Sequence, residues 1–263
     1  MEMVLTRRKE QAMDRVGETG VNRLGSIMVI EEYYSSQNVL VRFTESGYKT
    51  RCTYQQFCNG TVKNVYDRTV FGVGYIGEGK YKPSANGKAT IQYLTWYNML
   101  KRCCDEKFKE ECPTYKDCTV AEEWHSLQAF GKWFDENYYS VGKERMEIDK
   151  DCLIRGNKLY SPETCVFLPH KINTLIIKND ALRGEFPVGV KATSRNKDKY
   201  EARCSDNKGK RVYLGTFDSP IKAFNVYKEF KEKLIKEVLQ EYKECIPVNV
   251  YNALIGYTVE IND

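Results

Sequence analysis

The stretch Met146–Asn173, MEIDKDCLIRGNKLYSPETCVFLPHKIN, decides how the middle of this chain is interpreted. MEIDKD and TCVFLP predict two short strands separated by the turn region GNKLYSPET, and Pro169 before HKIN favours the start of a helix. Asp149 would then lie near the end of the first strand and Asn173 on the helix. A carboxylate and an amide oxygen held in this way are suitable ligands for a hard divalent cation.

Neighbouring polar residues supply candidates for the remaining chemistry. Hydrolysis of a phosphodiester needs, besides the cation, a base that activates water near the phosphate. Asp151 and His170 could act as that base, and Lys150 could contact the phosphate. The same residues also have a structural interpretation. Asp149 and Asp151 could cap a turn, and Asn157 could supply a left-handed turn residue. The amide of Asn173 could simply face solvent.

The segment Tyr93–Asn173 resembles the phage-type HNH endonuclease family, through YLTWYNMLKRC, PTYKDCTVAEEW, FGKWF and IDKDCLIRGNKLYSPETCVFLP. The resemblance implies a ββα-metal fold that cleaves DNA with Mg²⁺ or Mn²⁺ held by Asp149 and Asn173. The position of the family's general-base histidine is Lys150 in this chain. Because a lysine is protonated near neutral pH, the resemblance leaves two readings, an active nuclease and a relic that no longer cuts.

The C-terminal third predicts a basic three-stranded sheet. Three strands are predicted, VGVKATSR, KYEARCSD and KRVYLGTFD, joined by the turns NKDK and NKGK. A long helix follows, with Ser219 as its cap and Pro220 at its first position. Nine Lys or Arg and four acids lie between Ala181 and Phe217. A strip with this excess of positive charge would attract phosphate.

This C-terminal order, Gly189–Tyr227, resembles the Apetala-two/ethylene-response-type DNA-binding domain, in which a sheet enters the major groove. The resemblance implies double-stranded DNA as the partner and gives Leu214, Gly215 and Phe217 structural roles. It nominates five basic residues for contacts with bases or phosphates: Arg195, Lys199, Arg203, Lys210 and Arg211.

The N-terminal part predicts a separate β module. GSIMVIEEYY and NVLVRFTESGYKTRC alternate apolar and polar residues between turn signals, which is typical of strands and indicates a small β-barrel resembling Src-homology-three-like modules. GEGKYKPSANGKAT then suits a connector. Two amphipathic helices are predicted after it, over 91–108 and, with Thr119 as its cap, over 119–139.

Composition limits the remaining possibilities. The chain has 263 residues and a formal net charge of +5, and no apolar run is long enough to span a membrane. Without an export signal, we expect the ten cysteines to remain thiols in the cytoplasm, inside an infected bacterial host. Their spacing argues against structural zinc, and no motif indicates an organic cofactor or a serine or cysteine hydrolase.

The sequence therefore predicts an α+β, multidomain protein. Its parts are a small β-barrel-like module, a central helical and ββα-metal unit, and a three-stranded antiparallel sheet with a packed helix. The expected function is sequence-directed DNA cleavage with a divalent metal. The alternative is an inactive HNH relic that binds DNA as a regulator or inhibits a host defence protein. The corresponding ranges are an N-terminal arm (1–19), the β module (20–80), the HNH-like unit (90–180), the DNA-binding domain (183–245) and a tail (246–263).

Overall fold

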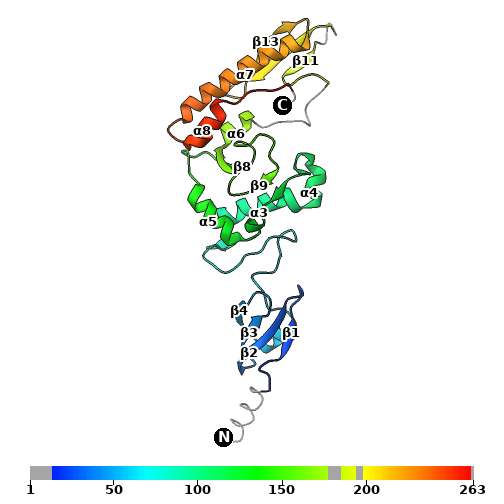
Figure 1. The fold of residues 1–263 in the computed structure, drawn as a ribbon, viewed down its shortest axis with the longest axis vertical. Coiled ribbons are helices and arrows are strands. Elements are labelled where there is room, and N and C mark those ends of the chain that lie inside the picture. The colour runs from blue at the N-terminus through cyan, green and yellow to red at the C-terminus, as the bar shows by residue number, and fades with distance from the viewer. Residues whose placement is uncertain (1–13, 177–184, 194–197, 262–263) are drawn as a thin grey trace. The chain divides into compact units, whose positions relative to one another are not determined.

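The structure, a computed structural model, describes residues 14–176, 185–193 and 198–261 and combines helices with sheets (Figure 1). Contacts divide the chain into two compact units. The first comprises residues up to 108 together with 120–134, and the second comprises 109–119 together with the residues from 135 onwards.

The N-terminal strands form an antiparallel meander in the order β1-β2-β3-β4. Their alternating pattern turns one face inward, where Met28, Val39 and Val41 are fully buried, and the short helix α2 covers this face with Phe57. The predicted closed barrel is wrong for the described residues, because the edge strands β1 and β4 pair only with β2 and β3. The bounds are β1 Thr19–Val21, β2 Ile27–Ser35, β3 Asn38–Phe43, β4 Lys49–Cys52 and α2 Tyr54–Cys58.

The connector contains a small hairpin that the sequence interpretation missed. Strands β5 (Ser84–Ala85) and β6 (Lys88–Ala89) pair across Asn86 and Gly87, whose φ angles of 51° and 75° are left-handed. Asn-Gly is the dipeptide that favours a two-residue turn of this kind.

The first predicted central helix is interrupted. Helix α3 (Ile91–Cys104) begins after the Thr90 cap, and the residue that follows it, Asp105, has an extended backbone. The carboxylate of Asp105 accepts hydrogen bonds from the backbone N–H groups of Lys107 and Phe108, so a second helix, α4 (Glu106–Glu111), starts there. A short 3-10 turn, η1 (Pro113–Tyr115), follows.

The second predicted helix, 119–139 with Thr119 as its cap, is wrong in its first part. Thr119 and Val120 form strand β7, and the Thr119 N–H donates to the Lys158 carbonyl at 2.9 Å. A 3-10 helix, η2 (Glu122–His125), comes next, and Tyr75 exchanges backbone hydrogen bonds with His125 and Leu127. These long-range bonds engage the His125 carbonyl and the Leu127 N–H, which a continuous helix would need, so α5 covers only Leu127–Asn137.

The quoted stretch folds as a hairpin followed by a helix. Strand β8 (Met146–Asp149) pairs antiparallel with β10 (Val166–Pro169), and α6 (His170–Ile176) starts directly after it. The loop between the strands contains β9 (Leu159–Tyr160), which pairs with β7.

The C-terminal part contains a three-stranded antiparallel sheet and two helices. The three predicted strands pair in the order β11-β12-β13, and α7 begins at the predicted Ser219 cap with Pro220 in its first turn. The bounds are β11 Val190–Ala192, β12 Tyr200–Ser205, β13 Arg211–Phe217, α7 Pro220–Tyr242 and α8 Val248–Ile255.

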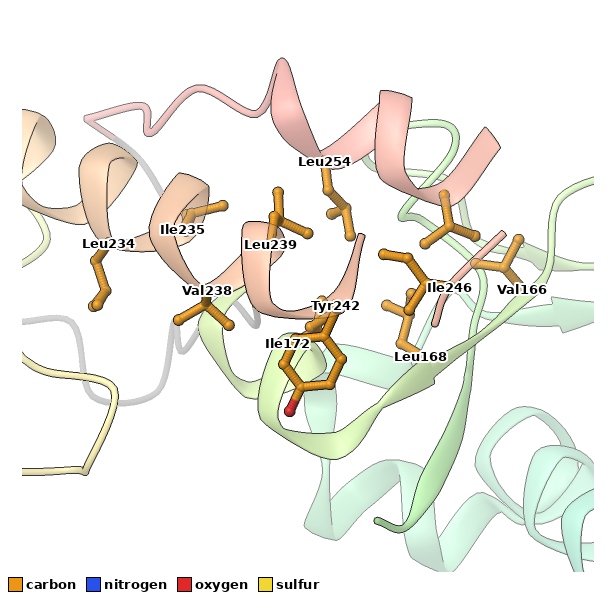
Figure 2. Packing of buried hydrophobic residues seen from close by; sticks show 11 residues of the cluster. Val166, Leu168, Ile172, Leu234, Ile235, Val238, Leu239, Tyr242, Ile246 and Leu254 are labelled. Carbon is orange, nitrogen blue, oxygen red and sulfur yellow. The ribbon is translucent and has the colours of Figure 1, made fainter. Parts of the chain in front are cut away.

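Helix α7 serves two cores. Its first half packs Ala223, Phe224 and Tyr227 against the sheet. Figure 2 shows its second half, where Val238 and Leu239 lie with side chains from β10, α6 and α8 in one apolar cluster. One continuous helix therefore supports both the sheet and the hairpin unit.

None of the helices in the described ranges has the length and apolar character that crossing a membrane requires.

Candidate cation and nucleic-acid site

The register of the hairpin determines which polar residues can meet. Glu147 lies opposite Leu168 and Asp149 opposite Val166, so strand alternation places both acids on one face of the hairpin. Pro169 lies opposite Met146, and the next residue, His170, donates its backbone N–H to the Arg145 carbonyl at 2.9 Å. Helix α6 therefore starts beside the beginning of β8.

Glu147 is the centre of a polar cluster that the sequence interpretation did not identify. One carboxylate oxygen lies 3.0 Å from His170 Nδ1 and also accepts from Arg145, while the other accepts from the Asn173 side-chain amide. Burial raises the pKa of Glu147, but the hydrogen bonds from Asn173, Arg145 and His170 lower it further, so the net pKa is below its ordinary value. Glu147 is therefore an ionised acceptor shared by three donors.

Asn173 carries an acceptor without a partner. Its side chain comes from α6 and is 7% exposed, and its Oδ1 atom has no hydrogen-bond partner within the described parts of the chain. A buried acceptor left in this state costs about 1–3 kcal/mol, so such atoms are rare unless they serve a ligand or an ion. Asn173 Oδ1 is thus available to a cation.

Asp149 takes part in the turn that follows β8. Its Oδ1 atom accepts the backbone N–H groups of Asp151 at 3.0 Å and Cys152 at 2.6 Å. Burial, and then the neighbouring charge of Asp151, raise the pKa of Asp149 to about 6. A cation beside this carboxylate would relieve both effects, and perturbed acids of this kind are frequent at functional sites.

Lys150, the residue that follows β8, is buried, whereas a lysine at the end of a strand usually faces water. Its ammonium group lies 3.5 Å from the Asp151 carboxylate and 5.8 Å from the centre of the Tyr160 ring. The Asp151 carboxylate, which the sequence interpretation considered as a base for water, is therefore paired with Lys150.

Asn157 holds the loop between the strands in shape. Its side-chain nitrogen donates to the carbonyls of Lys150 and Leu159, both at 2.7 Å, and its oxygen accepts the Leu159 N–H at 3.1 Å. Beside it, Gly156 has a φ of 77° and supplies the left-handed residue of the turn. Asn157 therefore cross-links the segment that carries Asp149 and Lys150.

The oxygen donors of this unit, one carboxylate and one amide, suit a hard divalent cation that needs few protein ligands, and they do not form a cluster of several acids. Within residues 14–176, 185–193 and 198–261, no group of three or more His, Cys, Asp or Glu side chains is arranged to hold a metal. Mg²⁺, however, commonly keeps several waters and takes only one or two protein oxygens together with a substrate phosphate. The Asp149 carboxylate, at the end of β8, and the Asn173 oxygen, on α6, are the candidate ligands of that kind on this unit.

The C-terminal sheet turns its basic residues away from α7. Ala202 and Cys204 of β12 are buried under the helix, so alternation places Glu201 and Arg203 on the opposite, open face. Arg203 donates to Glu201 from Nε at 3.1 Å and lies 2.9 Å from it through Nη2, and Lys191 Nζ is 3.7 Å from the same carboxylate.

The other nominated basic residues lie at the ends of this sheet. Arg211 is exposed at the start of β13, opposite Ser205. Lys199 and Lys210 are exposed next to β12 and β13, and the backbone N–H of Lys210 belongs to a turn closed by Asp206. Leu214 and Phe217 pack against the core under α7, as their predicted structural roles require. Arg195 lies outside the described residues.

Comparison with known proteins gives no match: no family model fits the chain, and neither a curated protein nor a solved structure resembles it significantly.

Proposed function

We propose that this chain is a phage-type, sequence-directed DNA endonuclease that hydrolyses phosphodiester bonds with Mg²⁺ or Mn²⁺ inside a bacterial host cell. The observation that carries the proposal is the buried Oδ1 atom of Asn173, which has no hydrogen-bond partner among the described residues. It lies on a hairpin-helix unit that also presents an ionised acid and a histidine. The order and spacing of these residues agree with the ββα-metal resemblance, which the proposal adopts.

The residues have separate roles in this proposal. Asp149 and Asn173 hold the cation through oxygen atoms. The cation, when bound, polarises the phosphate and neutralises the charge that develops on it. Lys150, whose ammonium group is fixed by Asp151, contributes positive charge close to the phosphate.

The sheet β11-β12-β13 selects the DNA site in this proposal. A twisted antiparallel ribbon fits the major groove, and its open-face side chains reach base edges while flanking cations contact phosphates. We assign base or phosphate contacts to Arg203 and Arg211 and phosphate contacts to Lys199 and Lys210. Binding through these residues should weaken steeply as salt rises, because phosphate contacts release counterions.

Nicking of supercoiled DNA tests the catalytic part of the proposal. In Mg²⁺ or Mn²⁺ the wild type should nick, whereas Asp149→Asn and Asn173→Leu should each lower the rate at least about 100-fold. Glu163→Gln, an exposed charge change in the same loop, is the matched control and should nick like the wild type. No nicking by the wild type at high protein excess would remove the hydrolytic function.

A second candidate function is DNA binding without cleavage, as a regulator or as an inhibitor of a host defence protein. The observation that favours it is the buried Lys150 ammonium group beside Asp151, because a fixed positive charge there could replace the cation. In that case DNA should bind equally well in EDTA, and Lys150→His should create nicking that the wild type lacks. Nicking by the wild type that disappears in Asp149→Asn would exclude this candidate.

A further inference from the structure

We infer that His170 is the general base of the hairpin-helix unit and that Glu147 is the residue that positions it. The inference rests on the proposed function, and it assigns a base to a chain whose expected base position is occupied by a lysine. Neither the family resemblance nor the spacing of the sequence gives Glu147 a role.

The contact with Glu147 engages one of the two nitrogen atoms of the His170 imidazole. His170 Nδ1 lies 3.0 Å from a Glu147 carboxylate oxygen that the neighbouring guanidinium of Arg145 also contacts. The same Nδ1 also lies 3.3 Å from Arg145 Nη2, which can only donate. The shorter contact with the Glu147 carboxylate favours hydrogen on Nδ1, which leaves the lone pair on Nε2. The His170 side chain is 49% exposed, which leaves Nε2 accessible to water and substrate.

The other candidate bases are engaged elsewhere. The Asp151 carboxylate lies 3.5 Å from Lys150 Nζ, and a lysine side chain is not an ordinary base for water near neutral pH. Asp149 accepts two backbone N–H groups in the turn after β8 and is assigned to the cation. Among the candidate bases taken from the sequence, His170 is therefore the one whose second ring nitrogen can accept a proton from water at an exposed position.

Glu147 also links the base to the proposed cation ligand. Its second oxygen accepts the Asn173 amide, so one carboxylate orients two side chains that lie three residues apart on α6. Residues at this spacing lie on the same face of a helix. This shared acceptor sets the rotamer of Asn173 so that Oδ1, rather than the amide nitrogen, remains unpartnered.

The proposed step is the hydrolysis of one phosphodiester bond by water. A water molecule gives one proton to His170 Nε2 as its oxygen forms a bond to phosphorus, and the bond from phosphorus to the leaving deoxyribose oxygen breaks. The leaving oxygen takes a proton from solvent, and His170 returns its proton to solvent. The net change converts a phosphodiester and water into a phosphomonoester and an alcohol.

Nitrogen-15 NMR of the histidines tests the positioning role without relying on activity. The chain has only two histidines, so spectra are simple, and His170→Gln identifies the signals of His170 by their loss. In its neutral form the His170 ring should carry its hydrogen on Nδ1 in the wild type and in Glu147→Gln, which keeps an acceptor. In Glu147→Ala the ring should revert to the Nε2–H tautomer that is preferred in water.

Nicking kinetics under the same conditions test the catalytic role. His170→Gln and Glu147→Ala should lower kcat by about 10²- to 10⁴-fold, the range for a lost general base, with KM for DNA unchanged within about twofold. Glu147→Gln should recover most of the loss, and a single cooperative unfolding transition should show that each variant is folded.

The outcomes separate this inference from the proposed function. Nicking at the wild-type rate by His170→Gln would overturn the base role alone. An unchanged tautomer in Glu147→Ala would overturn the positioning role alone. Absence of nicking by the wild type would remove the proposed function together with the base role, and the tautomer would then only describe a structural ion pair.

Discussion

At the scale of single residues, the raised pKa of Asp149 predicts a pH-dependent stability in metal-free protein. Burial and the charge of Asp151 raise this pKa from 3.8 to about 6, so the folded state prefers the protonated acid. The destabilisation is complete above about pH 6 and disappears as the pH falls toward the unfolded value. Its size is at most about 3 kcal/mol.

Asp149→Asn should therefore stabilise the protein in EDTA at pH 7.5 and have little effect near pH 4. The amide oxygen can still accept the two backbone N–H groups, so the turn should be preserved. Urea unfolding at both pH values measures the difference. Equal stabilities of variant and wild type at pH 7.5 would show that the acid is better solvated than the structure indicates. Added Mg²⁺ should raise the melting temperature of the wild type but not of the variant.

The sequence nominated Asp149, Asn173 and His170 as candidates but did not give their hydrogen-bond partners. Glu147 lies two residues before Asp149, and strand alternation alone would have placed both acids on one face. The missing information was the register, which pairs Met146 with Pro169 and brings the start of α6 beside Glu147. Register depends on the long loop between the strands, whose length is compatible with several pairings.

At the scale of elements, Asn157 should control the shape of the loop between β8 and β10. Asn157→Ala removes the three hydrogen bonds that join Lys150 and Leu159 through its side chain. Each net contribution is about 0.5–1.5 kcal/mol, so we expect a loss of roughly 1–3 kcal/mol in the free energy of unfolding. Hydrogen exchange of the Leu159 amide should accelerate at the same time.

Asn207→Ala, in the exposed turn between β12 and β13, is the matched control and should change stability by less than about 0.5 kcal/mol. Unaltered exchange at Leu159 in Asn157→Ala would mean that the pairing of β9 with β7 alone holds this loop.

Element boundaries were predictable where local chemistry determines them. The Ser219 cap and the alternation of β12 and β13 are encoded within a few residues, and both were found. The break before α5 was not, because it depends on Tyr75, some fifty positions earlier in the chain, whose backbone bonds to His125 and Leu127. Periodicity alone therefore extended the helix over residues that pair elsewhere.

At the scale of the whole molecule, α7 should make the sheet and the hairpin unit unfold together. Leu239 is 1% exposed in the cluster that also contains β10 and α6, so Leu239→Ala should lower stability by about 2–5 kcal/mol. Because the same helix covers the sheet through Phe224, amide exchange should rise in β12 as well as in β10. Lys236→Ala, on the exposed side of α7, is the control. Faster exchange confined to β10 and α6 would show that the two halves fold separately.

The continuity of α7 has a consequence for where DNA would be cut. Its 23 residues span about 35 Å, close to one turn of duplex DNA, with no flexible joint between the sheet end and the hairpin end. The interval between the bases that are recognised and the phosphate that is broken would then be a built-in dimension of the protein. Seven extra residues between Phe230 and Leu234, nearly two full turns, would keep the rotational phase and lengthen the helix by about 10 Å. The cut should then move by roughly three base pairs. One extra residue would instead rotate the hairpin by about 100° about the helix axis and abolish cutting at a defined distance from the recognised bases.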